Sequence, residues 1–124
     1  MKIKSGKNVI KNPLAKVILA NQNLYFLDKL NQLTRQIWVA EYKFNSTSKH
    51  RADYFCESLK IAIEIEGGLF CQGRHIRPKG YINDMKKYNL YSMNKILLLR
   101  FTRPEMTNIK TFDMINELIN IIQK

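Results

Sequence analysis

Residues 51 to 68 read RADYFCESLKIAIEIEGG, which predicts two short extended segments joined by a turn. The second segment, IAIEIE at 61–66, alternates in polarity. Because successive side chains of a strand point to opposite faces, the three isoleucines share one face, and Ala62, Glu64 and Glu66 share the other. The pattern therefore predicts a strand with one apolar face and one acidic face.

A third carboxylate stands in the first segment, where a hairpin would bring Asp53 toward Glu64 and Glu66. Neighbouring like charges repel, so solvent or bound cations must offset the repulsion between these carboxylates. Mg²⁺ prefers one or two carboxylate oxygens and otherwise keeps its waters. We therefore expect a site for Mg²⁺ or Mn²⁺. In the alternative interpretation the glutamates form the solvent face of an edge strand, and Asp53 pairs with Arg51 or Lys60 on the surface.

The chain of 124 residues has the length of one domain with a core. We expect a basic arm at 1–12 and a single domain at 13–124. No segment approaches the roughly 20 apolar residues that span a bilayer, and the N-terminus lacks the apolar core of a secretory signal. A cytoplasmic protein of a bacterium or a phage-infected cell is expected, with Cys56 and Cys71 as free thiols.

The charge points to a polyanionic partner. The chain has 21 Lys and Arg against 10 Asp and Glu, which gives a net charge of +11. Such an excess favours nucleic acid, and we expect DNA as the partner rather than a membrane, because no helix pairs a basic face with an aromatic one. The alternative is that the lysines only keep a small domain in solution.

Helical spacing begins at Pro13, and the run Asn-Gln-Asn at 21–23 could divide that helix in two. Its apolar stripe comprises Val17, Ala20, Leu24 and Leu27, with Phe26, Leu30 and Leu33 beside it. Residues 37–44 are rich in β-branched and aromatic side chains, which favour a strand. Strands are then expected at 51–56 and 60–66.

A loop rich in glycine and cations follows at 69–80, and a helix is predicted at 81–94. The helix is expected to turn Ile82, Met85, Leu90 and Met93 inward, with Asp84, Lys87, Tyr88 and Tyr91 on its more polar side. The apolar run within 95–102 is typical of a buried central strand. A capping box at Thr102–Glu105 precedes a last helix. The predicted order is helix, three strands, helix, strand, helix.

Several short sequence blocks follow one another along this order of elements. They are EYKF at 41–44, RADYF at 51–55, IEIEGG at 63–68, GRHIR at 73–77, and Gly80-Tyr81 followed by Asp84 and KYN at 87–89. Over roughly residues 23–102 the chain resembles the PD-(D/E)XK nuclease superfamily, and the blocks are similar to those of small phage-type endonucleases related to very-short-patch repair enzymes. The resemblance implies an α/β, restriction-endonuclease-like αβββαβ core, with a mixed central sheet flanked by helices and a C-terminal helix added.

The resemblance implies that Asp53 and Glu64 bind the metal, helped by the backbone carbonyl of Ile65. Glu66 stands where the family motif has a lysine that activates water or stabilises the phosphate, so it is expected to be a further ligand or to orient the water. Lys87, on the following helix and facing back toward the sheet, is the candidate replacement for that lysine. His75 is the other, because an imidazole near neutral pH can act as a general base or protonate the leaving oxygen. Both have plainer interpretations, as a solvated helix lysine and an ordinary loop residue.

Cations around this site would hold the DNA backbone, since phosphate contacts give affinity without sequence information. The candidates are Arg51, Arg74, Arg77, Lys79 and Lys86. The expected function is that of a metal-dependent endodeoxyribonuclease encoded by a phage or mobile element. The alternatives are an inactive nucleic-acid-binding module on the same fold, and a homodimeric resolvase of Holliday-type junctions, whose paired cuts need two-fold symmetry.

Overall fold

The computed structural model describes residues 12–67 and 78–124, without the side chains of residues 78, 79 and 81. Its elements are α1 (Pro13–Thr34), β1 (Val39–Tyr42), β2 (Ala52–Cys56), β3 (Ile61–Glu66), α2 (Pro78–Met93), β4 (Leu97–Thr102), the 3-10 helix η1 (Arg103–Thr107) and α3 (Ile109–Gln123). The predicted order of helices and strands is confirmed. The first strand is shorter than the predicted 37–44, and α2 begins three residues earlier than predicted, with a proline at its first position.

The four strands form one mixed sheet in the order β1-β2-β3-β4. β1 runs antiparallel to β2, and β2 runs antiparallel to β3, whereas β3 and β4 are parallel. A parallel pair needs a long crossover, and α2 lies within that connection. The coarse prediction of an α/β domain with a mixed sheet is confirmed.

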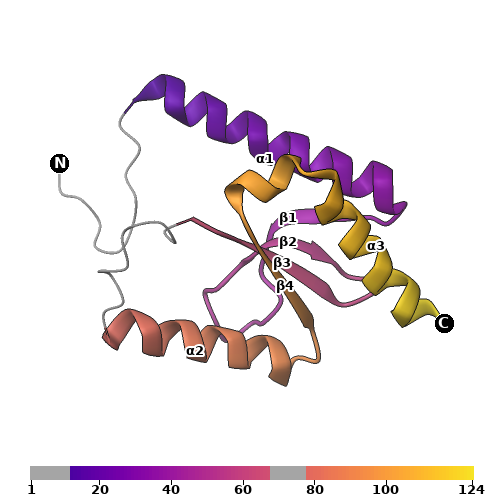
Figure 1. Cartoon of the computed structure of the whole chain (residues 1–124). Helices are drawn as coiled ribbons and strands as arrows, with labels where there is room; N and C mark the ends of the chain where they lie inside the picture. The colour runs from indigo at the N-terminus through magenta and orange to yellow at the C-terminus, as the bar shows by residue number, and fades with distance from the viewer. Residues whose placement is uncertain (1–11, 68–77) are drawn as a thin grey trace.

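The helices lie on both faces of the sheet. α1, η1 and α3 cover one face, and α2 lies against the other (Figure 1). The larger core cluster joins Phe26 and Leu30 of α1 to Ile63 of β3 and Ile115 of α3. The smaller cluster, on the α2 side, includes Ala62 and Phe55 together with Tyr91 and Ile96. The isoleucine face and the acidic face of β3 thus meet different helices.

Helix α1 is continuous through the 21–23 run, so the predicted interruption is wrong. Asn12 caps its start, because its Oδ1 accepts a hydrogen bond of 2.8 Å from the N–H of Leu14. The buried side chains are Phe26, Leu30 and Thr34, while Val17 and Leu24 of the predicted stripe are 54% and 65% exposed. The C-terminal half of α1 therefore anchors the helix to the core.

Strand β4 was predicted to be central, but it forms an edge of the described sheet. Leu97 is 47% exposed, and of the six residues only Phe101 is buried. An apolar run does not by itself distinguish an edge strand from a central one, because strand order is set by tertiary pairing.

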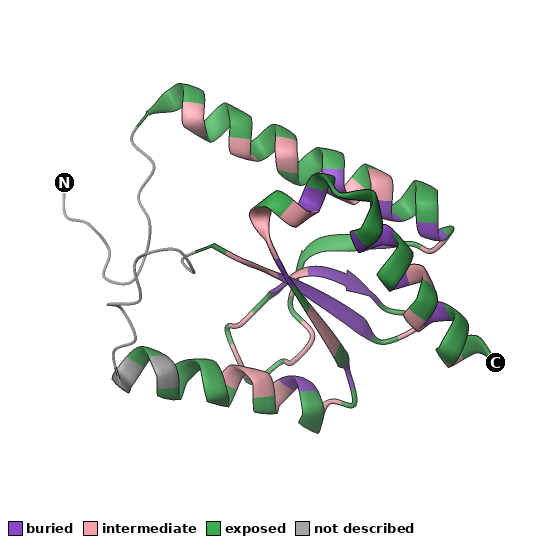
Figure 2. Cartoon of the chain, in the orientation of Figure 1, coloured by how far each residue is buried: buried purple, intermediate pink, exposed green. Residues whose placement is uncertain are grey.

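The prediction that Ile82, Met85 and Met93 turn inward is wrong. Ile82, Met85 and Met93 are 50%, 49% and 82% exposed, whereas Tyr91 is buried. Figure 2 shows that exposed positions predominate along α2. The sheet face beneath this helix carries Glu64, and a buried carboxylate needs hydrogen-bond donors. A tyrosine hydroxyl supplies one, so the polar side of the helix turns inward.

The predicted capping box lies at the start of η1 rather than at the start of the last helix. The backbone N–H of Thr102 donates to Oε1 of Glu105 at 2.7 Å, and α3 has its own cap, where Oδ1 of Asn108 accepts from the N–H of Lys110 at 2.9 Å. Across residues 12–67 and 78–124, none of the helices combines the length and apolar content needed to cross a bilayer.

Candidate active site

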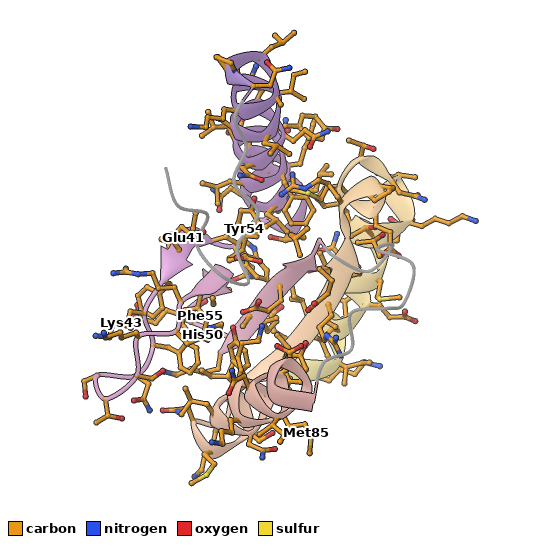
Figure 3. The ribbon with its side chains drawn as sticks, turned by 90° about the vertical axis from the view of Figure 1, so that its left-hand side faces the viewer. Glu41, Lys43, His50, Tyr54, Phe55 and Met85 are labelled. Atoms are coloured by element: carbon orange, nitrogen blue, oxygen red, sulfur yellow. The ribbon has the colours of Figure 1, made fainter. Side chains whose placement is uncertain are left out.

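The β2–β3 hairpin brings two carboxylates together. Its register pairs Tyr54 with Ile63 and Phe55 with Ala62, and one further step places Asp53 opposite Glu64. Residues opposite each other on antiparallel strands project from the same face. That face is turned toward α2. Figure 3 shows Phe55 on this side of the sheet and Tyr54 on the side of α1.

Asp53 is half-buried and fixed by the sheet itself. Its Oδ2 accepts a hydrogen bond of 2.8 Å from the backbone N–H of Ile65. Burial raises its pKa above 3.8, the nearby charge of Glu64 adds to the rise, and the Ile65 N–H and Lys87 oppose it. The carboxylate therefore ionises less readily than one in water.

Glu64 is only 5% exposed, and three side chains surround its carboxylate. The hydroxyl of Tyr91 donates to Oε2, and His50 Nε2 lies 2.9 Å from the same oxygen. The Nζ of Lys87 lies 3.6 Å from Oε1. Burial raises the pKa of Glu64, against the lowering effect of the Tyr91 and Lys87 contacts. The alternative interpretation, in which Glu64 lies on a solvent face, is wrong.

His50 joins the site from the segment before β2 (Figure 3). Its Nε2 lies 2.9 Å from the Tyr91 hydroxyl as well as from Glu64. Burial lowers its pKa from 6.5, and Lys87 lowers it further, so the ring is neutral at pH 7. Since the tyrosine proton is directed to Glu64, the consistent assignment has Nε2–H of His50 donating to that carboxylate.

Glu66 is held by a second cation. Nε of Arg100, on β4, lies 3.1 Å from Oε2 of Glu66, and the hydroxyl of Tyr88 donates to the same oxygen at 3.3 Å. The guanidinium carbon of Arg100 also lies 4.3 Å from the centre of the Tyr88 ring, a cation–π contact. Glu66 is thus engaged by an arginine on the neighbouring strand.

The carboxylates do not form a closed three-ligand cage. Among the described residues, no group of three or more His, Cys, Asp and Glu side chains is arranged to hold a metal ion. The charges of Glu64 and Glu66 both act on Asp53, and Glu66 is also paired with Arg100. A cation with many bound waters could still use two carboxylates.

Of the predicted site residues, the structure brings Asp53, Glu64 and Lys87 together. Arg51 and Lys86 are exposed. The predictions for Arg74, His75 and Arg77, and for the side chain of Lys79, fall outside the described part of the chain.

Sequence reasoning missed His50, Tyr91 and Arg100. One available signal was helical spacing, since Tyr91 lies four residues after Lys87 and so shares its face. A second available signal was the position of His50, three residues before Asp53 in the sequence. Arg100 was not identifiable without the register of β3 with β4.

Comparison of the chain with protein-family models, with curated proteins and with solved structures finds no match. The resemblance to PD-(D/E)XK nucleases stays a prediction from the sequence blocks.

Proposed function

We propose that this protein is a metal-dependent endodeoxyribonuclease that hydrolyses DNA phosphodiester bonds on a restriction-endonuclease-like αβββαβ fold. The order of elements and the carboxylates on β2 and β3 support this assignment. The single observation that carries it is the placement of Asp53 and Glu64 on neighbouring strands, beside Lys87 and on a strongly basic chain.

Two partly uncompensated carboxylates favour a bound cation. Burial raises the pKa of both Asp53 and Glu64, and the charge of a neighbouring carboxylate adds to each rise, Glu64 for Asp53 and Glu66 for Glu64. A divalent cation beside them would remove this repulsion, and hard oxygen donors suit Mg²⁺ or Mn²⁺. The fit rests on Asp53 and Glu64, with the Ile65 carbonyl as the further donor expected from the resemblance. When bound, the metal would neutralise the phosphate and lower the pKa of a coordinated water.

The surrounding side chains have distinct roles in this proposal. Lys87 places a positive charge at the carboxylates, where a phosphate oxygen gains negative charge during attack. His50 and Tyr91 orient Glu64 through hydrogen bonds, so they are positioning residues. Arg100 neutralises Glu66, which stands in place of the motif lysine.

DNA would bind through exposed cations next to this face. Arg51 directly precedes β2, and Lys86 lies on α2 beside Lys87; both side chains are exposed. We expect each to contact a phosphate rather than a base, which gives affinity without sequence preference.

The deciding experiment compares nicking of supercoiled plasmid by wild type, Asp53→Asn and Glu57→Gln. Asparagine keeps the size of aspartate and an oxygen for the Ile65 N–H. Glu57, an exposed carboxylate in the turn of the same hairpin, is the matched control. We expect wild type and Glu57→Gln to cut in Mg²⁺ or Mn²⁺ and to stop in EDTA. Asp53→Asn should bind DNA without cutting, and equal cutting by all three would refute the assignment.

One observation favours a second candidate, a nucleic-acid-binding module without catalysis. Lys87, Tyr91 and His50 already engage both oxygens of Glu64, which leaves less room for a metal. This candidate predicts DNA binding that is insensitive to EDTA and no nicking under any metal condition. The plasmid experiment therefore separates the two.

A further inference from the structure

Arg103 is a half-buried cation that no carboxylate neutralises. It follows β4 directly and is the first residue of η1. All 10 Asp and Glu residues of the chain lie within the described ranges 12–67 and 78–124, and none of their side chains there is within ion-pair distance of Arg103. The other described arginines, Arg35, Arg51 and Arg100, are exposed. A charge partly withdrawn from water costs free energy without a counterion, so a bound anion would stabilise Arg103.

Neutral amides hold the guanidinium of Arg103 in place. Its Nη1 donates to Oε1 of Gln22 at 3.0 Å and to Oδ1 of Asn23 at 3.4 Å. Amide oxygens orient a guanidinium without cancelling its charge. Within the described part of the chain, Nη1 makes all the hydrogen bonds of this side chain, so Nε and Nη2 keep their donors. Arginine presents such donors in a rigid fork that matches a phosphate.

The register of β3 and β4 places Arg103 at the end of the sheet that carries the acidic residues. Thr102 pairs with Glu66, so Arg103 stands one residue beyond the acidic end of β3. Side chains alternate along a strand, and the two arginines at this end point to opposite faces. Arg100 contacts Glu66 on the side of α2, whereas Arg103 contacts Gln22 on the side of α1.

Tyr54 lies between Arg103 and the carboxylate of Asp53. Its hydroxyl donates to the backbone carbonyl of Asn23 at 3.2 Å, and the side chain of Asn23 accepts from Arg103. Burial raises the pKa of Tyr54 to about 12, the charge of Asp53 adds to the rise, and the charge of Arg103 opposes it. The cation and the carboxylate therefore both act on one hydroxyl, although they project from opposite faces of the sheet.

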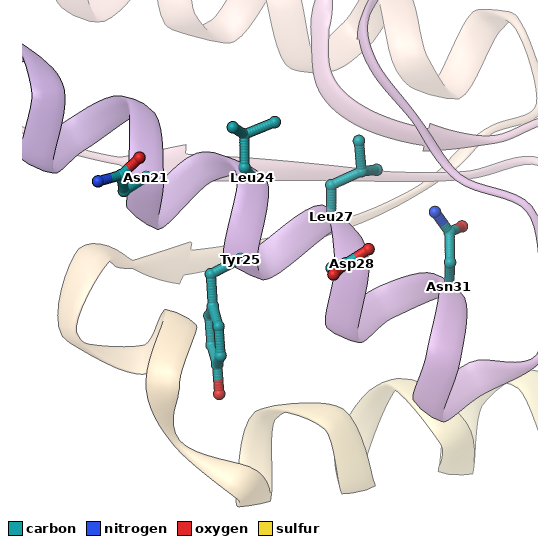
Figure 4. A pocket seen from close by; sticks show the side chains of 6 residues that line it. All are labelled: Asn21, Leu24, Tyr25, Leu27, Asp28 and Asn31. Carbon is teal, nitrogen blue, oxygen red and sulfur yellow. The ribbon is translucent and has the colours of Figure 1, made fainter.

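The surface beside Arg103 leaves room for a sugar-phosphate chain. Gln22 borders a groove of about 280 Å³ between α1 and η1, which is also lined by Ile18, Asn21, Tyr25 and Thr107. In Figure 4 Tyr25 points to one side of α1, and Leu24 and Leu27 point to the other. A second hollow, of about 510 Å³, includes Leu24, Leu27 and the carboxylate of Asp28. An anion is therefore favoured in the groove beside Arg103 rather than in the second hollow.

We propose that Arg103 binds a phosphate of the DNA backbone on the α1 side of the sheet. The inference rests on the proposed function, because that function makes DNA the ligand. The phosphate is not the one that is cut, since Asp53 and Glu64 project from the opposite face. The DNA strand thus passes over the end of the sheet where β3 and β4 end. Two parallel hydrogen bonds from the guanidinium fix its position there.

DNA binding in EDTA tests the proposal, with fluorescence anisotropy of a labelled duplex oligonucleotide and the full-length chain. One phosphate contact contributes about 0.9 to the slope of log affinity against log salt, so Arg103→Gln should weaken binding about eightfold at 0.1 M salt and little at 1 M. The matched control is Arg35→Gln, which removes an exposed arginine at the other end of α1. It should bind nearly as tightly as wild type. Equal losses in the two variants would overturn the proposal.

A second pair of variants separates phosphate binding from a purely structural link between η1 and α1. Gln22→Glu places a carboxylate against Arg103, so it should keep the link and the melting temperature but weaken DNA binding as much as Arg103→Gln does. Gln32→Glu is the matched control, because Gln32 also accepts a hydrogen bond from a half-buried cation, Lys29, at 3.4 Å. If Arg103 only joined η1 to α1, the two glutamate variants would bind DNA alike, and the proposal would be wrong.

The binding measurement needs no cleavage, so it is independent of the nicking experiment. If the plasmid stays intact and the Arg103 and Gln22 variants lose affinity as expected, the phosphate site stands and the nuclease assignment fails. If the plasmid is nicked and Arg103→Gln binds like wild type, the phosphate site fails and the nuclease assignment stands. A wild type that does not bind DNA would overturn both.

Discussion

The Nζ of Lys87 on α2 lies 3.6 Å from Oε1 of Glu64 on β3, which joins the crossover helix to the acidic strand. In the PD-(D/E)XK nucleases that the sequence blocks resemble, the motif lysine is on the strand itself, two residues after the glutamate. Here the cation comes from a helix that follows a long connection in sequence. The positive charge at the carboxylates is therefore a property of the tertiary fold.

Lys87→Met should reduce the rate of DNA cleavage about 10²–10³-fold, the typical cost of removing one group that stabilises developing charge. DNA affinity should change little, since Lys87 is directed at Glu64. The matched control is Lys86→Met, which removes the exposed neighbour. That control should weaken DNA binding and leave single-turnover cleavage at saturating protein nearly unchanged. Identical effects of the two variants on cleavage would contradict the role of Lys87.

Asp53→Asn should raise the melting temperature at pH 7 in the absence of metal. Because burial raises the pKa of Asp53 above 3.8, the folded protein binds this proton more tightly than the unfolded chain. The stabilisation is complete below the unfolded pKa and is lost as pH rises through the folded value, so the ionised carboxylate destabilises the fold at pH 7. Asparagine avoids this cost, and the gain, a few degrees, should shrink toward pH 4. Thermal unfolding from pH 4 to 8 measures it, with Glu57→Gln as the control.

Mg²⁺ should make wild type more stable than Asp53→Asn, the reverse of the order expected without metal. A ligand that binds only the folded state adds about 2.7 kcal/mol at 100 times its dissociation constant, so wild type should gain stability as Mg²⁺ is titrated and Asp53→Asn should gain much less. Equal shifts in both proteins would place the cation away from Asp53.

Tyr91→Phe should lower stability by about 1–3 kcal/mol, because it removes a buried hydrogen-bond donor from Glu64. The hydroxyl also lowers the pKa of Glu64, so its loss should move the acidic limb of the cleavage profile to higher pH. Tyr88→Phe, which removes the hydroxyl that donates to Glu66, serves as the comparison and should leave that limb in place. A pH profile that is the same for both variants would exclude a coupling between Tyr91 and Glu64.

DNA binding in EDTA should weaken steeply with salt. If the protein neutralises about five phosphates, the slope of log affinity against log salt is about −4.5. Arg51→Gln with Lys86→Gln should reduce the magnitude of that slope by about 2, because each removed cation lowers it by about one unit. A slope that these substitutions leave unchanged would show that DNA occupies a different face.

The sequence predicted much of the hairpin that carries the site. The alternation at 61–66 identified β3 and its two faces, and Asp53 was expected beside Glu64 because antiparallel pairing follows from a short turn. His50 was missed because it precedes β2 in an irregular segment, where no periodic pattern indicates which way a side chain points.

The sequence by itself determined the order of elements, the start of α1 at Pro13 and the apolar and acidic faces of β3, since these depend on local spacing and capping. Only the tertiary structure decided that β4 is an edge strand, that α2 turns Tyr88 and Tyr91 toward the acidic face of β3, and that Arg100 reaches Glu66. The physical reason is that a buried carboxylate selects the helix face that offers hydrogen-bond donors, even when the opposite face is more apolar. Such a preference depends on contacts between residues far apart in the chain, which local patterns do not record.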